Sequence, residues 1–337
     1  MDGERHTTGD IWRDRRVLVT GGTGFLGAHV TRTLVAAGAR VTVVSRSGAG
    51  DLPLPGGVAS IHGDLRDPHV AALCTRDQEV VLHFASKIAG LAYNMRHPAE
   101  MMTYNTILDL QVMDAAARSG VSLFFYPSGT LVYDEAVATP IAETASTGGA
   151  ALVACQGATW AKRAAEAAIR CHEAEHDMKF VLARLSNVYG PGDDFDPETA
   201  HLIASTIRRV AGGKTPEIVG DGSALRAYLY VDDAVAAILR LLEVAPTGPV
   251  NIGGQHEVSV RDVVRLIVDV AGASVVPRLG AGGPSGLSRK LLDVTRLRTL
   301  VGFQESMPLR EGLRRTYEWY RRHAPPVGAA ASTPGGA

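Results

Sequence analysis

The stretch that decides the fold reads Val17-Leu18-Val19-Thr20-Gly21-Gly22-Thr23-Gly24-Phe25-Leu26-Gly27. Its first four residues predict a buried strand, and a turn with glycine at every third position follows at once. In such a turn Gly21 permits the sharp bend, Gly24 lets backbone N–H groups approach a pyrophosphate, and Gly27 lets the next helix pack on the strand. The positive end of that helix then faces the anion. The stretch therefore predicts the first strand, turn and helix of a dinucleotide-binding domain.

Strand-like apolar runs alternate with helical stretches on both sides of this motif, a pattern typical of a parallel sheet with helices on both faces. The expected fold class is α/β, a Rossmann-type doubly wound parallel sheet with a smaller C-terminal substrate-binding lobe. We expect strands at Arg16–Thr20, Arg40–Ser45, Ser60–His62, Val80–Phe84, Leu123–Tyr126 and Lys179–Arg184, and helices that begin near Gly24, Pro68, Pro98 and Ala158.

The domain boundaries follow from a change of character after Val188, where loops rich in glycine and proline begin. We expect an N-terminal tail at 1–14 and a dinucleotide-binding domain at 15–186, onto which 230–254 also packs. The substrate lobe would take 187–229 and 255–323. Residues 324–337 are mostly proline, glycine, alanine and serine, which bury too little surface to offset the entropy of ordering, so we expect a disordered tail.

The composition narrows the class of protein. The chain has 337 residues, 46% of them hydrophobic, and a formal net charge of -1, so neither a nucleic acid nor a membrane is an expected partner. No apolar run approaches the roughly 20 residues that cross a bilayer, and residues 1–16 are charged rather than signal-like, so we expect a cytoplasmic location. Cys74, Cys155 and Cys171 lack the spacing of a disulfide framework or metal site, and we expect buried thiols and no metal.

The end of the second strand distinguishes the two nicotinamide dinucleotides. A carboxylate there would accept from the ribose 2′-hydroxyl of NAD, whereas Ser45 and Arg46 suit a 2′-phosphate. The sequence therefore favours NADP and leaves NAD as the alternative, with Arg46 then a solvated surface residue. Asp64 follows the third strand and is placed to accept from the adenine amine.

Four further segments carry a family resemblance: His83–Gly90, Asn187–Pro191, Val250–Gly253 and Arg289–Leu297. With the glycine motif, they make the chain from Arg16 to His323 resemble the extended short-chain dehydrogenase/reductases of the NAD-dependent epimerase/dehydratase family. Within it the segments are most similar to those of GDP-L-fucose synthases, which are GDP-4-keto-6-deoxymannose epimerase/reductases, and next to those of GDP-mannose 3,5-epimerases. The resemblance implies an NAD(P)-dependent enzyme on a nucleotide sugar, GDP-linked, and a homodimer through helices near Tyr104–Arg118 and Ala158–Glu175.

The catalytic set that the resemblance implies is incomplete. The family uses a Tyr for proton transfer, a Lys four residues later and a Ser or Thr on the same oxygen. Lys162 matches the Lys, but the Tyr position is Ala158 and the Ser/Thr position is Gly129. Thr130 is the expected substitute, with Ser128 as the alternative, although a shift by one residue turns a side chain at a strand end to the other face.

A second pair of family residues, a Cys and a His, exchanges protons beside the sugar ketone. The Cys position is Leu131, whereas the His is retained as His201. The expected catalytic residues are therefore Lys162, His201 and Thr130. Surrogate acids would have to come from Tyr93, Tyr126, Tyr133 and Cys155, although core packing is the preferred interpretation of Tyr126 and Tyr133.

Binding residues are carried over in the same way, and for each basic one a solvated surface position is the alternative. Arg226 matches the residue that clamps the diphosphate, and Lys87 matches one beside the sugar and the nicotinamide. The expected cofactor-binding residues are Gly21, Thr23, Gly24, Phe25, Leu26, Gly27, Ser45, Arg46, Asp64, Leu65, Ala85, Ser86, Lys162, Leu185, Asn187 and Val188. The expected substrate-binding residues are Lys87, Asn187, His201, Arg209, Arg226 and Lys290.

Three functions fit these residues. The leading one is a GDP-sugar epimerase-type enzyme that moves protons through His201, Lys162 and a further group. The second is a full redox epimerase or reductase on an unusual sugar, in which a surrogate acid replaces the Tyr. The third is a cofactor-binding subunit without chemistry, against which the joint retention of Lys162, His201 and Arg226 argues.

Overall fold

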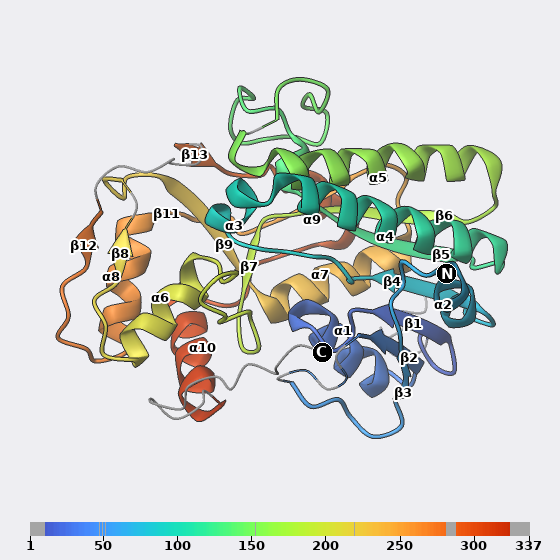
Figure 1. Cartoon of the computed structure of the whole chain (residues 1–337), viewed down its shortest axis with the longest axis horizontal. Coiled ribbons are helices and arrows are strands. Elements are labelled where there is room, and N and C mark those ends of the chain that lie inside the picture. Colours follow the sequence, from blue (N-terminus) through green and yellow to red (C-terminus); the bar gives the residue numbers. More distant parts are fainter. Residues whose placement is uncertain are drawn as a thin grey trace, which may run out of the picture.

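The structure is a computed structural model that describes residues 11–323, except 47, 49, 51, 152, 219 and 281–287 (Figure 1). The tail expected at 324–337 lies outside the described residues, as does most of the segment 1–14. Residues 11–14, which we expected in the N-terminal tail, pack on the sheet domain. Trp12 is buried, and the N–H of Asp14 donates to the carbonyl oxygen of Gly38 at 2.9 Å.

A seven-stranded sheet forms the centre of the molecule, with the strand order β10-β6-β5-β4-β1-β2-β3. All neighbouring strands in it are parallel. Six of them give the order of a doubly wound dinucleotide fold, so the predicted fold class is confirmed. The strands are β1 (Arg16–Thr20), β2 (Arg40–Ser45), β3 (Ala59–His62), β4 (Val80–His83), β5 (Leu123–Gly129), β6 (Lys179–Leu185) and β10 (Val250–Ile252).

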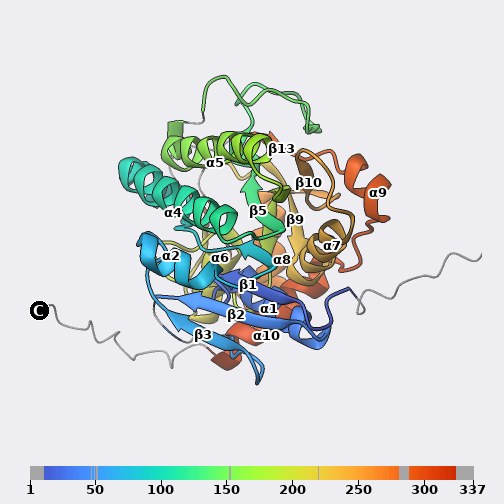
Figure 2. The same cartoon turned by 90° about the vertical axis from the view of Figure 1, so that its right-hand side faces the viewer.

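Helices cover both faces of this sheet (Figure 2). Leu18 and Phe124 face the side of α2, α4 and α5, whereas Val17 and Phe125 face the side of α1 and α7, because side chains alternate along a strand. Each face therefore has its own apolar cluster. The helices around the sheet are α1 (Phe25–Ala36), α2 (Pro68–Thr75), α3 (Leu91–Arg96), α4 (Pro98–Arg118), α5 (Gln156–Glu175), α7 (Val231–Val244) and α9 (Thr295–Val301), with short 3-10 turns η1 (Thr130–Val132) and η2 (Val153–Cys155).

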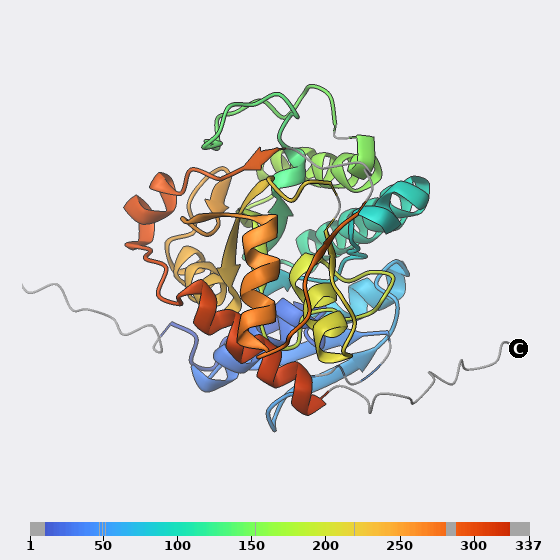
Figure 3. The same cartoon turned by 90° about the vertical axis from the view of Figure 1, so that its left-hand side faces the viewer.

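The rest of the chain builds smaller sheets beside the carboxyl ends of the large one. Strand β9 (Leu225–Tyr230) pairs with β7 (Asn187–Tyr189), β11 (Glu257–Ser259) and β13 (Arg289–Lys290), and β8 (Glu217–Ile218) pairs with β12 (Arg278–Leu279). Helices α6 (Leu202–Ala211), α8 (Val260–Val270) and α10 (Leu309–His323) gather on this side (Figure 3). We keep the division into a sheet domain and a substrate lobe as a proposal that this pairing supports.

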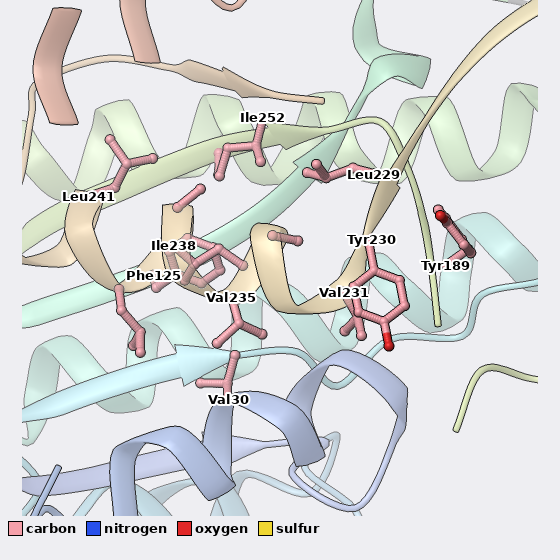
Figure 4. Packing of buried hydrophobic residues seen from close by; sticks show 14 of the residues in the cluster. Val30, Phe125, Tyr189, Leu229, Tyr230, Val231, Val235, Ile238, Leu241 and Ile252 are labelled. Atoms are coloured by element: carbon pink, nitrogen blue, oxygen red, sulfur yellow. The ribbon is translucent and has the colours of Figure 1, made fainter. Parts of the chain in front are cut away.

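One apolar cluster joins the two parts. Val30 of α1 and Phe125 of β5 pack with Ile238 of α7, and the same cluster continues to Leu229 and Tyr189 (Figure 4). Protein interiors are close-packed, so such a continuous cluster fixes the residues on either side of it relative to one another.

Among the element boundaries that differ from the expected ones, two lie at the candidate active site. Strand β5 runs to Gly129 because its pairing with β6 continues to Gly129 opposite Leu185. Helix α5 begins at Gln156, two residues before the expected start. The positions expected to carry the Ser/Thr and the Tyr therefore lie at the end of β5 and in the first turn of α5.

The cysteines differ from one another in burial. Cys74 and Cys155 are buried, but the expectation is wrong for Cys171, which is exposed on α5. No helix in the described part of the chain is long and apolar enough to cross a bilayer. In the same part, no group of three His, Cys, Asp or Glu side chains is arranged to hold a metal ion.

Candidate active site

The turn between β1 and α1 has no room for side chains at its key glycines. Gly21 has a φ of 64°, and a Cβ there would lie 2.7 Å from the backbone nitrogen of Ala85. A Cβ on Gly27 would lie 2.2 Å from the carbonyl oxygen of Gly21. Thr23, Phe25 and Leu26, the other expected residues of this turn, are half-buried. We call this turn, with the adjoining carboxyl ends of β2, β3 and β4, the cofactor edge.

The start of α1 is open to an anion. Its N-cap, Gly24, has no side chain to bind the amides of the first turn, and that turn contains no acidic residue. Unsatisfied N–H groups and the helix dipole together favour a negative charge at this position. A pyrophosphate at this position stays a prediction from the sequence.

The far end of the cofactor edge has two arginines around one aromatic ring. The guanidinium of Arg46 lies 5.3 Å from the ring centroid of Tyr104, and that of Arg66 lies 4.3 Å from it. Arg66 also donates to Asp64 and lowers the pKa of that carboxyl, so Asp64 is already paired. Ser45 Oγ donates to the carbonyl oxygen of Gly48 at 3.0 Å, and Leu65 is buried. Neither Tyr104 nor Arg66 is among the cofactor-binding residues expected from the sequence.

The loop after β4 is held by α4. Asn105 Oδ1 accepts from Ser86 Oγ at 3.0 Å and from the N–H of Lys87 at 2.7 Å, and its Nδ2 donates to the carbonyl oxygen of Lys87 at 3.0 Å. These bonds fix the backbone from Ala85 to Lys87. The ammonium of Lys87 is paired with Glu100, which raises its pKa, and Tyr93 donates to the same carboxylate at 3.0 Å. Lys87 is thus engaged on α4.

The end of β5 and the start of α5 form what we call the catalytic corner: Gly129, Ala158 and Lys162. Ala158 is 8% exposed, and Lys162 follows it by one helical turn. Lys162 Nζ donates to the carbonyl oxygen of Pro127 at 3.0 Å and lies 4.4 Å from the ring centroid of Tyr126. Burial lowers the pKa of Lys162, an effect that Asp109 and Glu166 oppose. The side chain therefore turns inward onto the strand.

Other groups near the catalytic corner do not replace the missing phenol. Tyr126 and Tyr133 are buried, as expected, and their hydroxyls donate to Asp109 at 2.5 Å and to Asn251 at 2.6 Å. Cys155 is buried at the N-cap of α5, where burial raises the pKa of its thiol.

Thr130 opens the 3-10 turn η1 after the catalytic corner. It lines a small pocket together with Leu131 and Lys290. The structure therefore brings the expected substitute, Thr130, next to a basic residue of β13, which is far away in the sequence.

Two cations lie side by side where the resemblance places the diphosphate. Lys290 of β13 is directly opposite Arg226 of β9 in a parallel pair. Burial lowers the pKa of Arg226 and lowers that of Lys290 to about 8, and no salt bridge to either is found among the described residues. Two adjacent unpaired cations repel one another, and a diphosphate between them would relieve that repulsion.

The remaining expected residues lie apart from one another. His201 is exposed at the N-cap of α6. Arg209 donates to the carbonyl oxygen of Thr215 at 3.0 Å and forms a salt bridge with Glu217 at 3.2 Å. It therefore stabilises the connection between α6 and β8. Asn187 Nδ2 donates to the carbonyl oxygen of Ala227 at 3.1 Å. The neighbours of Asn187 along the chain, Leu185 and Val188, are half-buried.

Sequence analysis also missed a line of buried polar residues behind the catalytic corner. His83 lies between Thr20 at 2.8 Å and Asp109 at 3.0 Å, and Asp109 accepts from Tyr126. A signal was present, because Asn105 and Asp109 interrupt the apolar face of α4 at a spacing of four residues. Polar side chains on a buried helical face need partners.

Comparisons with known proteins agree with this geometry. The model of the NAD dependent epimerase/dehydratase family matches residues 17–253. The dTDP-4-dehydro-6-deoxy-D-allose reductase of Streptomyces bikiniensis is 31% identical over 94% of this chain and 99% of its own. The GDP-L-fucose synthase of Escherichia coli is 28% identical over 91% of this chain and 96% of its own.

A solved structure extends the comparison to three dimensions. The UDP-glucose 4-epimerase of Thermotoga maritima with UDP-glucose has a TM-score of 0.84 to this chain at 28% identity, and the match covers 91% of this chain and 99% of that one. The same fold therefore accompanies the sequence match over almost the whole length. From the glycine turn, the strand order and these matches, the chain belongs to the NAD dependent epimerase/dehydratase family of NAD(P)-dependent enzymes.

Proposed function

We propose that this protein is an NADP-dependent enzyme that acts on a nucleotide-linked keto sugar and reduces its ketone. The observation that carries the proposal is the catalytic corner, where Lys162 is present but Ala158 stands in place of the phenol. Without that base, removal of a proton from a sugar hydroxyl loses assistance of about a hundredfold or more. Reduction of a ketone passes through the same proton transfer in the opposite direction, so another acid must supply the proton to the carbonyl oxygen.

Reduction of a ketone needs one hydride at the carbonyl carbon and one proton at the carbonyl oxygen. NADPH supplies the hydride when it is bound. We assign the proton to the ammonium of Lys162, which lies one helical turn from Ala158 on the same face of α5 and regains its proton from water. The names of two reductase relatives, at 31% and 30% identity over 94% of this chain, support reduction.

The sugar nucleotide is proposed to bind through Arg226 and Lys290 on β9 and β13. Their adjacent unpaired charges suit a diphosphate. We propose GDP as the nucleotide, because the sequence segments resemble those of enzymes that bind a GDP-linked sugar. The names of the GDP-L-fucose synthase relatives support this choice. The name of the Streptomyces relative makes a dTDP sugar the alternative.

NADP is proposed over NAD because of the basic end of the cofactor edge. Arg46 is exposed beside Tyr104, and Asp64 is already paired with Arg66. A 2′-phosphate would find an arginine there, whereas Ser45 and Arg46 occupy the end of β2, where a carboxylate would accept from the 2′-hydroxyl of NAD.

We also propose a cytoplasmic homodimer formed through α4 and α5. These helices pack on each other and expose large apolar side chains: Met102, Ile107 and Leu110 of α4, and Trp160 of α5. Exposed apolar groups clustered on neighbouring helices are typical of a subunit interface. Light scattering at micromolar concentration should give twice the chain mass, and a monomer mass would overturn the dimer.

A second candidate function is epimerisation beside the ketone through His201. This imidazole is exposed at the start of α6, and a histidine in its neutral form can accept a proton. Leu131 supplies no partner on the opposite side, so this function requires a further base.

One labelling experiment distinguishes these functions. The protein is incubated with GDP-4-keto-6-deoxymannose, and in parallel with a dTDP-linked 4-keto-6-deoxyhexose, either with NADPH carrying deuterium at the transferred position or with unlabelled NADPH in heavy water. We expect deuterium to pass from the cofactor to the sugar. Carbon-bound deuterium from heavy water without cofactor oxidation would instead show epimerisation. If neither sugar gains deuterium from the cofactor or from heavy water, the keto-sugar function is overturned.

A further inference from the structure

A buried carboxylate, Asp109, lies directly behind the catalytic corner. It is 1% exposed and accepts two hydrogen bonds, from His83 Nε2 at 3.0 Å and from the hydroxyl of Tyr126 at 2.5 Å. Burial disfavours its charged form, but Lys162 and the bonds from His83 and Tyr126 outweigh that effect and hold the pKa of Asp109 below its ordinary value. The acid is therefore charged inside the protein.

The hydrogen bonds on the other side of His83 lead to the cofactor edge. Thr20 Oγ1 lies 2.8 Å from His83 Nδ1 and accepts from the N–H of Ala85 at 3.1 Å. If Thr20 donates to Nδ1 and Nε2–H donates to Asp109, each of these polar groups is satisfied with a neutral imidazole. In that arrangement neither Thr20 nor His83 carries a positive charge, so the cation that compensates Asp109 must lie outside this row of hydrogen bonds.

Lys162 is the cation available to Asp109. The other buried acid nearby, Glu166, is paired directly with Arg184, whose Nε and NH2 donate to it at 3.1 and 2.7 Å. Asp109 has no such contact and meets Lys162 across the ring of Tyr126. A buried charge without compensation is costly, so Asp109 and Lys162 each stabilise the charged form of the other.

Tyr126 connects these two charges through different parts of its side chain. Its hydroxyl donates to Asp109, while its ring face lies 4.4 Å from Lys162 Nζ. Donation to a carboxylate shifts negative charge onto the phenol, which makes the ring face a better acceptor for a cation.

We infer that Asp109 and Tyr126 are positioning residues for Lys162: Asp109 keeps its ammonium charged, and the polarised ring of Tyr126 holds it at the catalytic corner in the absence of a phenol at position 158. The charged groups that face Lys162 are Asp109 from α4 and Glu166 from α5, with Arg184 of β6 behind Glu166, and the neutral phenol of Tyr126 from β5 presents its ring. The role of Lys162 in turnover rests on the proposed function, but the coupling of the two charges does not.

The test is a titration of Lys162 without any sugar. The chain has only five lysines, Lys87, Lys162, Lys179, Lys214 and Lys290, so protein labelled with ¹³C at lysine Cε gives five side-chain signals whose shifts report protonation. Loss of the Lys162 signal in Lys162→Met identifies it. In Asp109→Asn, we expect the Lys162 midpoint to fall by about one pH unit or more, because the carboxylate that favours the ammonium is gone.

Control and rescue variants separate coupling from simple damage to the fold. Asp233→Asn removes another buried carboxylate, which accepts from Ser306 on the far side of the sheet, and should leave the Lys162 midpoint unchanged. Asp109→Glu keeps the charge and should return the midpoint toward the wild-type value. Tyr126→Phe should give a smaller fall than Asp109→Asn, and it remains informative if Asp109→Asn does not fold.

Turnover provides a second measurement once the sugar is known. The basic limb of the pH profile of kcat should move to lower pH in Asp109→Asn and stay in place in Asp233→Asn. An unchanged Lys162 midpoint in both Asp109→Asn and Tyr126→Phe would overturn the inference, whether or not the protein reduces a keto sugar.

Discussion

The cofactor edge and the catalytic corner lie at the carboxyl ends of different strands of the same parallel sheet, yet they keep the family pattern to different degrees. At the cofactor edge, a Cβ on Gly21 or Gly27 would meet backbone atoms, so the glycines are required by the fold. At the catalytic corner, a Cβ on Gly129 would lie 3.8 Å from its nearest neighbour, an ordinary contact. Binding is therefore constrained by the backbone, whereas the chemistry depends on side chains that can change without loss of the fold.

The largest expected effect concerns the catalytic corner. Replacement Lys162→Met should lower kcat by about a hundredfold or more, because it removes the group that we assign to proton transfer. Steady-state kinetics with NADPH measures this. The matched control is Lys179→Met at the exposed start of β6, which should leave kcat unchanged. A Lys162→Met enzyme with nearly normal kcat would show that the retained lysine has no part in the chemistry.

The next largest effect concerns the cofactor edge, where a side chain does not fit at the glycines of the turn. Replacement Gly27→Ala should lower the free energy of unfolding by about 1–3 kcal/mol, because its Cβ would lie 2.2 Å from a backbone oxygen. It should also weaken NADPH binding about tenfold, since the turn that holds the pyrophosphate must move. Denaturant unfolding and fluorescence titration provide the two measurements.

The matched variant at the catalytic corner is Gly129→Ala. It should change the free energy of unfolding by no more than about 0.5 kcal/mol, because space is available for its Cβ. Equal losses in Gly27→Ala and Gly129→Ala would remove the steric distinction between the two regions.

A smaller effect is expected at the basic end of the cofactor edge. Replacement Arg46→Ala should weaken NADPH binding about tenfold and leave NADH binding unchanged, because only the former presents a 2′-phosphate. Dissociation constants for both cofactors, measured side by side, give the result. Arg40→Ala, which removes an exposed arginine paired with Asp14, is the control and should change neither. An equal loss for both cofactors in Arg46→Ala would count against NADP.

The smallest effect is a pH dependence on the substrate side of the catalytic corner. The pKa of Lys290 is lowered to about 8 by burial, so its ammonium is present below that pH and is lost above it. Affinity for GDP alone should therefore fall about fivefold between pH 7 and pH 9, the equivalent of roughly 1 kcal/mol. Calorimetry across this range measures it. In Lys290→Gln, GDP should bind with the weaker affinity at both pH values, and a retained pH dependence would assign it to another group.

The predictability of the site differs between these regions for a physical reason. The expected strands at Arg16–Thr20 and Arg40–Ser45 are found with the same bounds, because alternation and turn residues act over a few neighbours. The contacts of Lys87 with Glu100 and of Asp64 with Arg66 were not expected, although both pairs are close in sequence. Side-chain pairing depends on rotamers and loop geometry that the residue pattern does not specify.

The sequence by itself determined the glycine turn, the parallel α/β fold, the family, and the absence of a tyrosine at Ala158, since these follow from local pattern and from identity at single positions. Only the tertiary structure decided that Lys162 turns inward over Tyr126, that Asp109 is its counter-charge, and that Arg226 lies opposite Lys290. These contacts join strands and helices far apart along the chain, and a buried charge finds its partner only when those elements pack.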